Sequence, residues 1–330
     1  MEIEAMEQEL VLGIDIGGQT AKLGVVNRNG EILARTVVPS AQSSLNVFLD
    51  VLCGAITKLV AEASGVSGNR TGTVIGIGVG APNANYYKGT IEFAPNLKWT
   101  YVNGEPTVVE FCKLVSQRVG LPVRMTNDAN AAALGEMAYG AARGLRDFIM
   151  ITLGTGVGSG IVIDGRMVYG HDGFAGELGH VCVEEGGRQC NCGLKGCLET
   201  YASATGVART ARQMLEETDR ESLLRRLDAA AITSKDVYEA ASQGDAVARE
   251  IFEYTGTLLG RAFADFVKFS SPEAIVIFGG MAASREFFHD AMVRSMNGHL
   301  MLVWKNRIKI LYSSLKESDA AILGASALAW

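Results

Sequence analysis

One pattern of strand, glycine turn and strand occurs twice in this chain, near the N-terminus and again in the middle. Residues 9–38 hold three β-rich runs, with a glycine pair in the first turn and Asn-Gly in the second. Residues 146–169 repeat the plan, with a glycine-rich first turn and Asp-Gly in the second. Asn-Gly between apolar runs strongly favours a hairpin. The repetition predicts two domains built on one template.

Helical patterns separate and follow these hairpins, and the mixture predicts an α/β fold. We expect helices over 45–63, 128–139, 285–296 and 318–329, a largely helical region over 204–269, and strands over 274–278 and 308–311. The last helix has no strand after it, so we expect it to return to the first domain. The predicted division is a small domain of residues 1–126 plus 316–330 and a large domain of residues 127–315. Segment 216–234 is interpreted as a surface helix and loop.

Composition excludes several classes of protein. The chain is 48% apolar and 20% charged, which is ordinary for a soluble globular protein. Its net charge of −6 and the lack of a basic run predict no nucleic acid partner. The acidic start MEIEAMEQEL does not resemble a signal peptide, so we expect a cytoplasmic protein. No apolar stretch is long enough to span a bilayer, which predicts no membrane partner.

The second glycine-rich turn, residues 154–160, invites a nucleotide-binding interpretation. It is not a dinucleotide fingerprint, because a strand rather than a helix follows, and no Gly-Lys-[Ser/Thr] follows at Walker A spacing. By itself it is explained equally well as a structural turn. Asp15, Thr20 and Lys22 around the first turn favour phosphate, since Asp can hold a water bound to Mg²⁺ and Lys or Thr can contact phosphate. The two turns predict a nucleotide in a cleft between the domains.

Asp128 follows the apolar strand LPVRM and begins an alanine-rich helix. The simplest interpretation is a helix N-cap, a position that Asp favours. The same position suits a catalytic base, because a carboxylate at the positive end of a helix stays ionised and can accept a hydroxyl proton during phosphoryl transfer. Asn127 beside it can hold a neighbouring hydroxyl.

Three of the six cysteines lie within the stretch CNCGLKGC, and a histidine precedes them. His180, Cys190, Cys192 and Cys197 make the three-thiolate, one-imidazole set of a closed structural zinc site. Disulfides and free thiols are the alternatives, and a reducing compartment disfavours disulfides. We therefore predict a zinc loop over residues 180–197. The other cysteines, at positions 53, 112 and 182, are interpreted as small core residues.

Glu177 and Glu199 lie beside these ligands in the sequence. A metal that fixes the loop would position both carboxylates, and it would fix the tautomer of His180 so that its second ring nitrogen can donate to a substrate oxygen. This arrangement predicts a polyhydroxyl ligand. The alternative for each glutamate is an ordinary solvated surface carboxylate.

Together these motifs resemble the ROK family of sugar kinases and repressors. LGTGVGSGIVIDGRMVYGHDGFAGELGH is similar to the family signature, and CNCGLKGCLETYAS is similar to its zinc knot. DIGGQTAK, NDANAAALGE and IFGGMAAS are similar to its first phosphate motif, catalytic segment and adenosine loop. The resemblance covers residues 10–328 and implies a two-domain, actin-like ATPase fold of the ribonuclease H-like type, with a cleft between the domains.

The resemblance also implies a role for each matching residue. Asp128 would be the catalytic base, and His180 with Cys190, Cys192 and Cys197 would bind structural Zn²⁺. Sugar contacts are implied for Asn127, Asp128, Glu177, His180 and Glu199, with Ala81 in the loop beside the sugar. Contacts to the ATP phosphates are implied for Gly17, Gly18, Thr20, Gly154, Thr155 and Gly156. Asp15 and Lys22 would lie beside these phosphates and Mg²⁺. Contacts to adenosine are implied for Gly279 and Gly280.

The implied reaction is ATP-dependent phosphorylation of a hexose at its 6-hydroxyl, with glucose favoured. GIGVGAPN and APNLKW are similar to glucokinase segments, and Pro82 stands where N-acetylmannosamine kinases can place an arginine. The polar Asn83 and Asn85 leave N-acetylmannosamine or N-acetylglucosamine open. Polyphosphate and ADP also stay open as donors.

A non-catalytic, sugar-sensing regulator is the alternative of another class. The first phosphate motif begins too near Met1 to leave room for a DNA-binding domain, and Asp128 with both phosphate loops is present. We therefore expect an enzyme. The resemblance further implies a homodimer or higher homo-oligomer.

Overall fold

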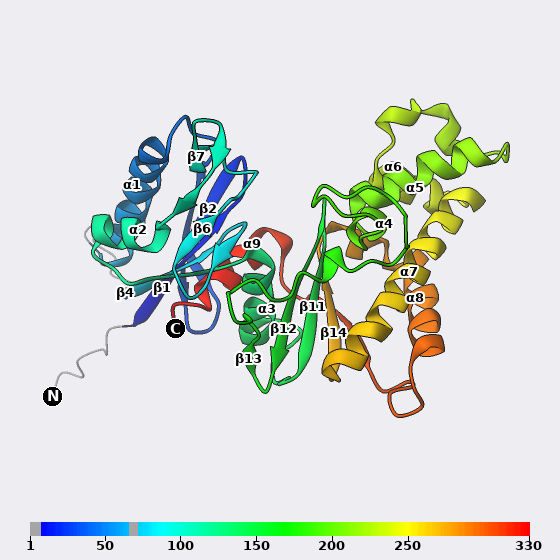
Figure 1. Cartoon of the computed structure of the whole chain (residues 1–330). Coiled ribbons are helices and arrows are strands. Elements are labelled where there is room, and N and C mark those ends of the chain that lie inside the picture. The colour runs from blue at the N-terminus through cyan, green and yellow to red at the C-terminus, as the bar shows by residue number, and fades with distance from the viewer. Residues whose placement is uncertain (1–7, 66–71) are drawn as a thin grey trace. The chain divides into compact units, whose positions relative to one another are not determined.

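A computed structural model describes residues 8–65 and 72–330 as two units, each with a five-stranded sheet (Figure 1). Unit 1 contains the described residues up to Gly144 together with Met167–Ala175 and Ser314–Trp330. Unit 2 contains Leu145–Arg166 and Gly176–Ser313. Two smaller sheets lie in unit 1, formed by β5 (Ala84–Asn85), β6 (Thr90–Glu92) and β9 (Val108–Val109) and by β7 (Tyr101–Val102) and β8 (Glu105–Pro106).

The two large sheets have the same strand order. Unit 1 has the order β10-β4-β1-β2-β3, and unit 2 has the order β15-β14-β11-β12-β13. Counted along the chain, the first strand of each sheet pairs antiparallel with the second and parallel with the fourth: β1 pairs with β2 and β4, and β11 pairs with β12 and β14. The bounds are β1 (Glu9–Ile16), β2 (Thr20–Asn27), β3 (Ile32–Pro39), β4 (Thr73–Gly80) and β10 (Val123–Thr126), then β11 (Phe148–Leu153), β12 (Val157–Ile163), β13 (Arg166–Met167), β14 (Ala274–Phe278) and β15 (Lys309–Tyr312). The predicted α/β class with one repeated template is confirmed.

Helices cover both faces of the sheet in unit 1. They are α1 (Leu45–Ala63), α2 (Phe111–Val119), α3 (Asp128–Tyr139) and α9 (Glu317–Ser326). Leu10, Leu12 and Ile14 of β1 point into the core beneath α1 and α2, whereas Val11 packs with Ile322 of α9. This alternation follows from the two-residue period of a strand.

The last helix lies directly on two glycines of the sheet. Gly13 of β1 and Gly78 of β4 are opposite each other in the ladder. A Cβ atom at Gly13 would collide with the carbonyl oxygen of Ile322, and one at Gly78 with that of Ala325. The two glycines therefore let the backbone of α9 pack against the strands at close range.

The helices of unit 2 are α4 (Glu199–Ala202), α5 (Ala204–Glu217), α6 (Ser234–Ser242), α7 (Ala246–Ser270) and α8 (Arg285–His299). Segment 216–234 lies mostly at the surface as expected, but in place of the predicted α-helix it has two short 3-10 turns and connecting loop after α5 ends at Glu217. The Asp245 carboxylate accepts hydrogen bonds from the Ser222 hydroxyl and the Leu223 N–H at 2.8 and 2.5 Å. These bonds hold the segment against the start of α7.

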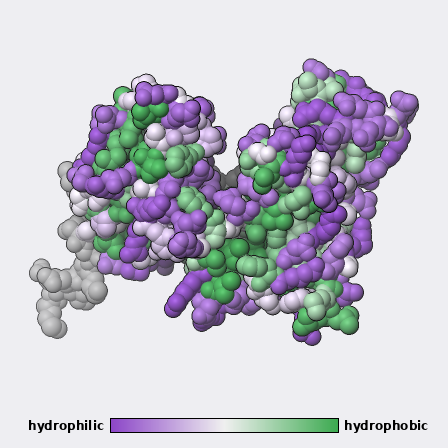
Figure 2. Space-filling model, in the orientation of Figure 1, coloured by the Kyte–Doolittle hydropathy of each residue, from purple (hydrophilic) through white to green (hydrophobic). Residues whose placement is uncertain are grey.

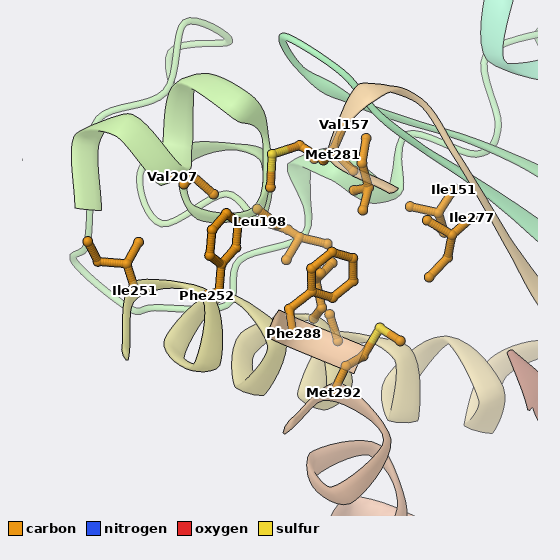
Figure 3. Close-up of a cluster of buried hydrophobic side chains, with 14 of the residues drawn as sticks. Ile151, Val157, Leu198, Val207, Ile251, Phe252, Ile277, Met281, Phe288 and Met292 are labelled. Atoms are coloured by element: carbon orange, nitrogen blue, oxygen red, sulfur yellow. The ribbon is translucent and has the colours of Figure 1, made fainter. Parts of the chain in front are cut away.

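The core of unit 2 lies between its sheet and helices α5 to α8 (Figure 3). Phe252 lies near Val207 and Leu198, and Phe288 lies between Phe252 and the strand residues Ile151 and Ile277 of the same cluster. Gly256 of α7 lies so close to α8 that a Cβ there would collide with the Phe288 carbonyl oxygen. Core packing therefore accounts for most of the apolar side chains of α7, whereas Phe269 near its end is 76% exposed.

The border between the units differs from the predicted one. Residues 127–144 belong to unit 1, because α3 packs against α9 and β4. Residues 167–175 also belong to unit 1, although they lie between strands and loops of unit 2 in the sequence. A sequence division that follows chain order does not predict such a return.

The surface is mixed in hydropathy, and hydrophilic residues dominate the region of α5 and α6 in Figure 2. Met301, Leu302 and Val303, between α8 and β15, are all more than half exposed, at 61%, 84% and 52%. Throughout the part of the chain that the structure describes, no helix combines the length and the apolar character needed to cross a membrane.

We expect Gly78→Ala to lower the free energy of unfolding by about 2 kcal/mol, because its methyl group must push α9 away from the sheet. Gly54→Ala in α1 is the control, since a Cβ there meets no atom within 4 Å. It should stabilise by up to about 1 kcal/mol through helix propensity. Urea unfolding measures both variants. Equal stability of Gly78→Ala and the wild type would contradict the packing described for α9.

Candidate active-site residues and metal loop

Three parallel strands of unit 1 end at one row of the sheet. Gly80 at the end of β4 is paired with Asp15 of β1 on one side and with Thr126 of β10 on the other. The next residue, Ala81, is fully buried, and its N–H donates to the Thr126 carbonyl at 3.1 Å. Asp15 and the start of α3 therefore come from distant parts of the sequence to the same edge, which is where ligands bind in open α/β sheets.

The N-cap of α3 is Asn127, and Asp128 is the first residue of the helix. Asn127 Oδ1 accepts a hydrogen bond from Ala129 N at 2.8 Å, and Asp128 Oδ1 accepts from the same N–H at 2.8 Å. The N-cap interpretation of Asp128 is therefore wrong. Asn127 fulfils that role, and N-capping does not explain the carboxylate that follows.

Burial raises the pKa of both aspartates at this edge. The pKa of Asp15 rises to about 6, because desolvation outweighs the nearby Lys22 ammonium, and the Asp128 carboxylate raises it further. Lys22 lies opposite Asp15 in the ladder of β1 and β2. Asp128 keeps an exposed face, yet the protein around it removes enough water to raise its pKa, against the hydrogen bond from Ala129. Each carboxylate is thus more basic than a free aspartate.

The first glycine turn joins β1 to β2. Gly17 N donates to the Thr20 carbonyl at 2.9 Å, which closes the turn. Gly18 borders a surface recess of about 610 Å³ with a polar lining that includes Asn96 and Lys98. A Cβ at Gly18 would lie 3.2 Å from the Asn96 carbonyl oxygen, so a side chain here would crowd the recess. The turn leaves room for a ligand with polar groups.

Two glycine turns of unit 2 also lie at one sheet edge. Gly154, Thr155 and Gly156 follow β11, and Gly279 with Gly280 follows β14, which is parallel to β11. Gly279 has a φ of 105°, and a Cβ there would lie 2.5 Å from the Leu153 carbonyl oxygen. Only glycine fits that position without strain. The predicted phosphate and adenosine residues of unit 2 are therefore neighbours.

Three predicted sugar-binding residues belong to unit 2. His180 is part of the metal loop, and Glu177 and Glu199 lie on either side of this loop in the sequence. Glu177 Oε2 lies 3.9 Å from His180 Nε2. Glu199 begins α4, and its Oε2 accepts a hydrogen bond from Val157 N at 3.0 Å, directly after the glycine turn. Glu199 Oε1 lies 3.9 Å from Cys190 Sγ. Ala81, Asn127 and Asp128 belong to unit 1, and each set is described within its own unit.

The predicted metal ligands converge. The ligand atoms of His180, Cys190, Cys192 and Cys197 all lie within 4.8 Å of one another. His180 Nδ1 is 3.7 Å from Cys190 Sγ, and Cys192 Sγ is 3.6 Å from Cys197 Sγ. Bonds of about 2.3 Å from a tetrahedral metal place two sulfurs about 3.8 Å apart, whereas a disulfide needs about 2.05 Å. The geometry fits a four-coordinate metal ion and leaves all three cysteines free of disulfides.

Cys182 is not a core residue, contrary to the sequence prediction. Its side chain is exposed, and the residue forms an isolated β-bridge with Cys197. Cys53 is buried in unit 1 as expected, and Cys112 is half-buried. The apolar neighbours of Cys182 in sequence gave the wrong prediction, because this part of the chain is a loop rather than a core strand.

A family model for the ROK family matches residues 11–330. The chain belongs to the ROK family.

Several members of the ROK family are similar to this chain over most of its length. A glucokinase of Halalkalibacterium halodurans is 39% identical over 84% of this chain and 82% of its own. A glucokinase of Streptomyces coelicolor is 35% identical over 97% of both chains. The crystal structure of a ROK family glucokinase from Streptomyces griseus, in complex with glucose and AMPPNP, has a TM-score of 0.74 and 36% identity over 97% of this chain and 98% of its own.

Segment 167–175 packs against the loop that follows Ala81. The sequence did not predict this contact. The rings of Tyr86 and Tyr169 stack at 3.9 Å, and Asn85 Nδ2 donates to the Asp172 carbonyl at 2.7 Å. Asn85 Oδ1 accepts from the backbone N–H of Tyr87 at 3.1 Å. Two aromatic residues at positions 86 and 87 are a weak signal, because nothing in the sequence names their partner.

The two loop asparagines are used within the protein. Asn83 has a φ of 53°, a left-handed conformation that Asn tolerates, and its Nδ2 donates to the Glu92 carbonyl at 3.0 Å. Asn85 is fully buried. Their amides therefore stabilise the loop, and this observation removes the argument for an acetamide contact at either residue.

We expect Asp15→Asn to increase stability at pH 8 in the absence of Mg²⁺ and nucleotide. A carboxyl with a pKa raised from 3.8 to about 6 contributes stability below pH 3.8 that is lost as the pH rises through 6. Because one pKa unit corresponds to about 1.4 kcal/mol, the variant should gain about 3 kcal/mol relative to the wild type between pH 4 and pH 8. Urea unfolding across this range tests it. Parallel stability profiles of the two proteins would contradict the raised pKa.

Proposed function

We propose that this protein is a sugar kinase that transfers the γ-phosphoryl group of ATP to the 6-hydroxyl of glucose. The observation that carries the proposal is similarity to glucokinases over most of the chain, at 35% identity over 97% of it and at 39% identity over 84% of it. A relative at 36% identity was solved with glucose and an ATP analogue. The placement of Asp15, Asn127 and Asp128 at one sheet edge supports it.

In this proposal Asp128 is the catalytic base. Its carboxylate accepts the proton of the 6-hydroxyl while that oxygen forms a bond to the γ-phosphorus. The bond from that phosphorus to the bridging oxygen breaks, and ADP leaves with the bridging oxygen. A raised pKa makes Asp128 a stronger proton acceptor than a free aspartate, and the hydrogen bond from Ala129 holds its orientation.

The remaining residues orient the two substrates. In the proposal, Glu177, His180, Glu199 and Asn127 contact sugar hydroxyls, and the loop that begins at the buried Ala81 lies beside the sugar. The backbone of the glycine turns at 17–18 and 154–156 contacts the phosphates of ATP, with Thr20 and Lys22 beside the first turn. Gly279 and Gly280 lie against adenosine. Their lack of side chains lets the nucleotide approach the backbone.

Two metal ions belong to the proposal. Zn²⁺ would be held by His180, Cys190, Cys192 and Cys197, a donor set that it prefers. Mg²⁺ would be held near Asp15 through water, where it neutralises phosphate charge. Burial raises the pKa of the Cys190 and Cys197 thiols, so a bound cation would be needed to keep them as thiolates at neutral pH.

The test of the function is a coupled assay of kcat/KM with MgATP for glucose, mannose, fructose, N-acetylmannosamine and N-acetylglucosamine. We expect glucose to exceed the acetylated sugars by about a hundredfold, because a pocket shaped for a 2-hydroxyl excludes an acetamide. Asp128→Asn should keep the fold and lower kcat by about a thousandfold.

Other outcomes of this assay are decisive too. Preference for an acetylated sugar would keep the mechanism and overturn the substrate. Sugar binding without turnover would support the non-catalytic regulator instead. A kcat of Asp128→Asn equal to that of the wild type would exclude Asp128 as the base. The expected homo-oligomer and cytoplasmic location stay predictions.

Removal of zinc should weaken glucose binding more than catalysis, because the metal would fix the loop of residues 180–197, and Glu177 and Glu199 lie shortly before and after this loop. We expect the KM for glucose to rise about tenfold or more in a preparation shown to be zinc-free by elemental analysis. Readdition of zinc should restore the KM. Normal glucose kinetics in the zinc-free protein would show that the metal does not position these residues.

A further inference from the structure

Helix α4 and the start of α5 are bonded to the glycine turn of unit 2 at three points. Ala204 N donates to the Gly154 carbonyl at 2.8 Å, and Thr205 Oγ1 donates to the Thr155 carbonyl at 2.9 Å. The third bond joins Val157 N to Glu199 Oε2 at 3.0 Å. Contacts that fix the position of α4 therefore also fix the position of the glycine turn.

Arg188, in the metal loop, also contacts α4. Its Nη1 donates to the carbonyl oxygens of Thr200 and Gly206 at 2.8 and 3.2 Å. Its Nε donates to Gln213 Oε1 at 2.9 Å, and the guanidinium lies 4.3 Å from the centre of the Tyr201 ring. The Arg188 backbone N–H also donates to the Tyr201 hydroxyl at 3.0 Å. One side chain thus joins the residues just before Cys190 to α4 and α5.

This guanidinium is largely buried, since Arg188 is 8% exposed, and among the described residues it forms no ion pair with a carboxylate. The Glu217 carboxylate acts on it only from a longer distance. A buried cation is tolerated only when several hydrogen bonds and a ring face compensate for the lost water. A methionine would fill similar space at lower cost, so the bonds to α4 are what distinguish arginine here.

We propose that Arg188 is a positioning residue that locks α4 to the metal loop. Through Thr200 it fixes Glu199, and through the three bonds of α4 and α5 it fixes the glycine turn. Sugar contacts and phosphate contacts in unit 2 therefore depend on one buried side chain. The kinetic part of this inference rests on the proposed kinase function, whereas the part that concerns the metal loop does not.

The test compares Arg188→Met and Arg188→Lys with a matched control, Arg209→Met. Arg209 and Arg188 line one surface recess of about 570 Å³ in unit 2, and Arg209 contacts the metal loop by one bond, to the Gln189 carbonyl at 3.1 Å. The first readout is the rate of zinc release to a coloured chelator, and the second is kcat and KM for glucose and for ATP. Circular dichroism and a thermal melt establish that each variant is folded.

We expect Arg188→Met to release zinc about tenfold faster and to raise both KM values about tenfold, with kcat changed much less. Arg188→Lys should recover part of each effect, because lysine keeps one donor to the Thr200 carbonyl. Arg209→Met should behave as the wild type. If Arg188→Met does not fold, Gln213→Leu should show smaller changes in the same direction, because it removes one acceptor of the guanidinium.

Wild-type zinc release and unchanged KM values in folded Arg188→Met would overturn the proposal. Equal effects in Arg209→Met would also overturn it, because they would point to general loss of charge in the recess. If the wild type does not phosphorylate glucose, the proposed function fails, and the zinc release rates still test the lock between Arg188 and α4.

Discussion

Parallel strands that end in register carry the candidate aspartates of unit 1 and the glycine turns of unit 2. In unit 1, Asp15, Gly80 and Thr126 lie side by side at the ends of β1, β4 and β10. In unit 2, β11 and β14 are parallel, and the turns that leave them bring Gly279 against Leu153. Because turns that leave neighbouring parallel strands start from one edge, segments far apart in the sequence meet there. The positions of the aspartates and glycine turns all follow from this register.

The same edge explains the electrostatics of the aspartates. The buried strands and the start of α3 remove part of the water around Asp15 and Asp128, although Asp128 keeps an exposed face, and this desolvation raises the pKa of both carboxyl groups. Lys22, opposite Asp15 in the hairpin, offsets part of this effect for that residue. The fold thus keeps two carboxylates at positions where their negative charge is unfavourable. In the proposed reaction Asp128 would act as the proton acceptor and Asp15 would lie beside a magnesium-bound nucleotide. Such perturbed carboxyl groups are typical of functional sites.

Unit 2 shows why a chain with two large cores would still use a metal site. The segment from His180 to Cys197 has isolated bridges in place of a sheet ladder, and Cys190 and Cys197 are buried within it. A few backbone hydrogen bonds close this loop, Arg188 joins it to α4 through the Thr200 carbonyl, and a metal at the ligand cluster would add a further link. A metal at this point would stabilise the position of Glu199 more than the fold as a whole.

The sequence alone determined the local patterns: the repeated hairpins, helices 45–63 and 128–139, and the four metal-ligand residues, whose spacing is read directly from the chain. It did not determine partners in space. Asn127 rather than Asp128 caps α3, Cys182 is exposed, and segment 167–175 returns to unit 1. Whether Asn85 faces a ligand or the Asp172 carbonyl was likewise decided by packing. Periodicity and spacing depend on neighbours along the chain, whereas burial and hydrogen-bond partners depend on contacts between residues that only the folded chain brings together.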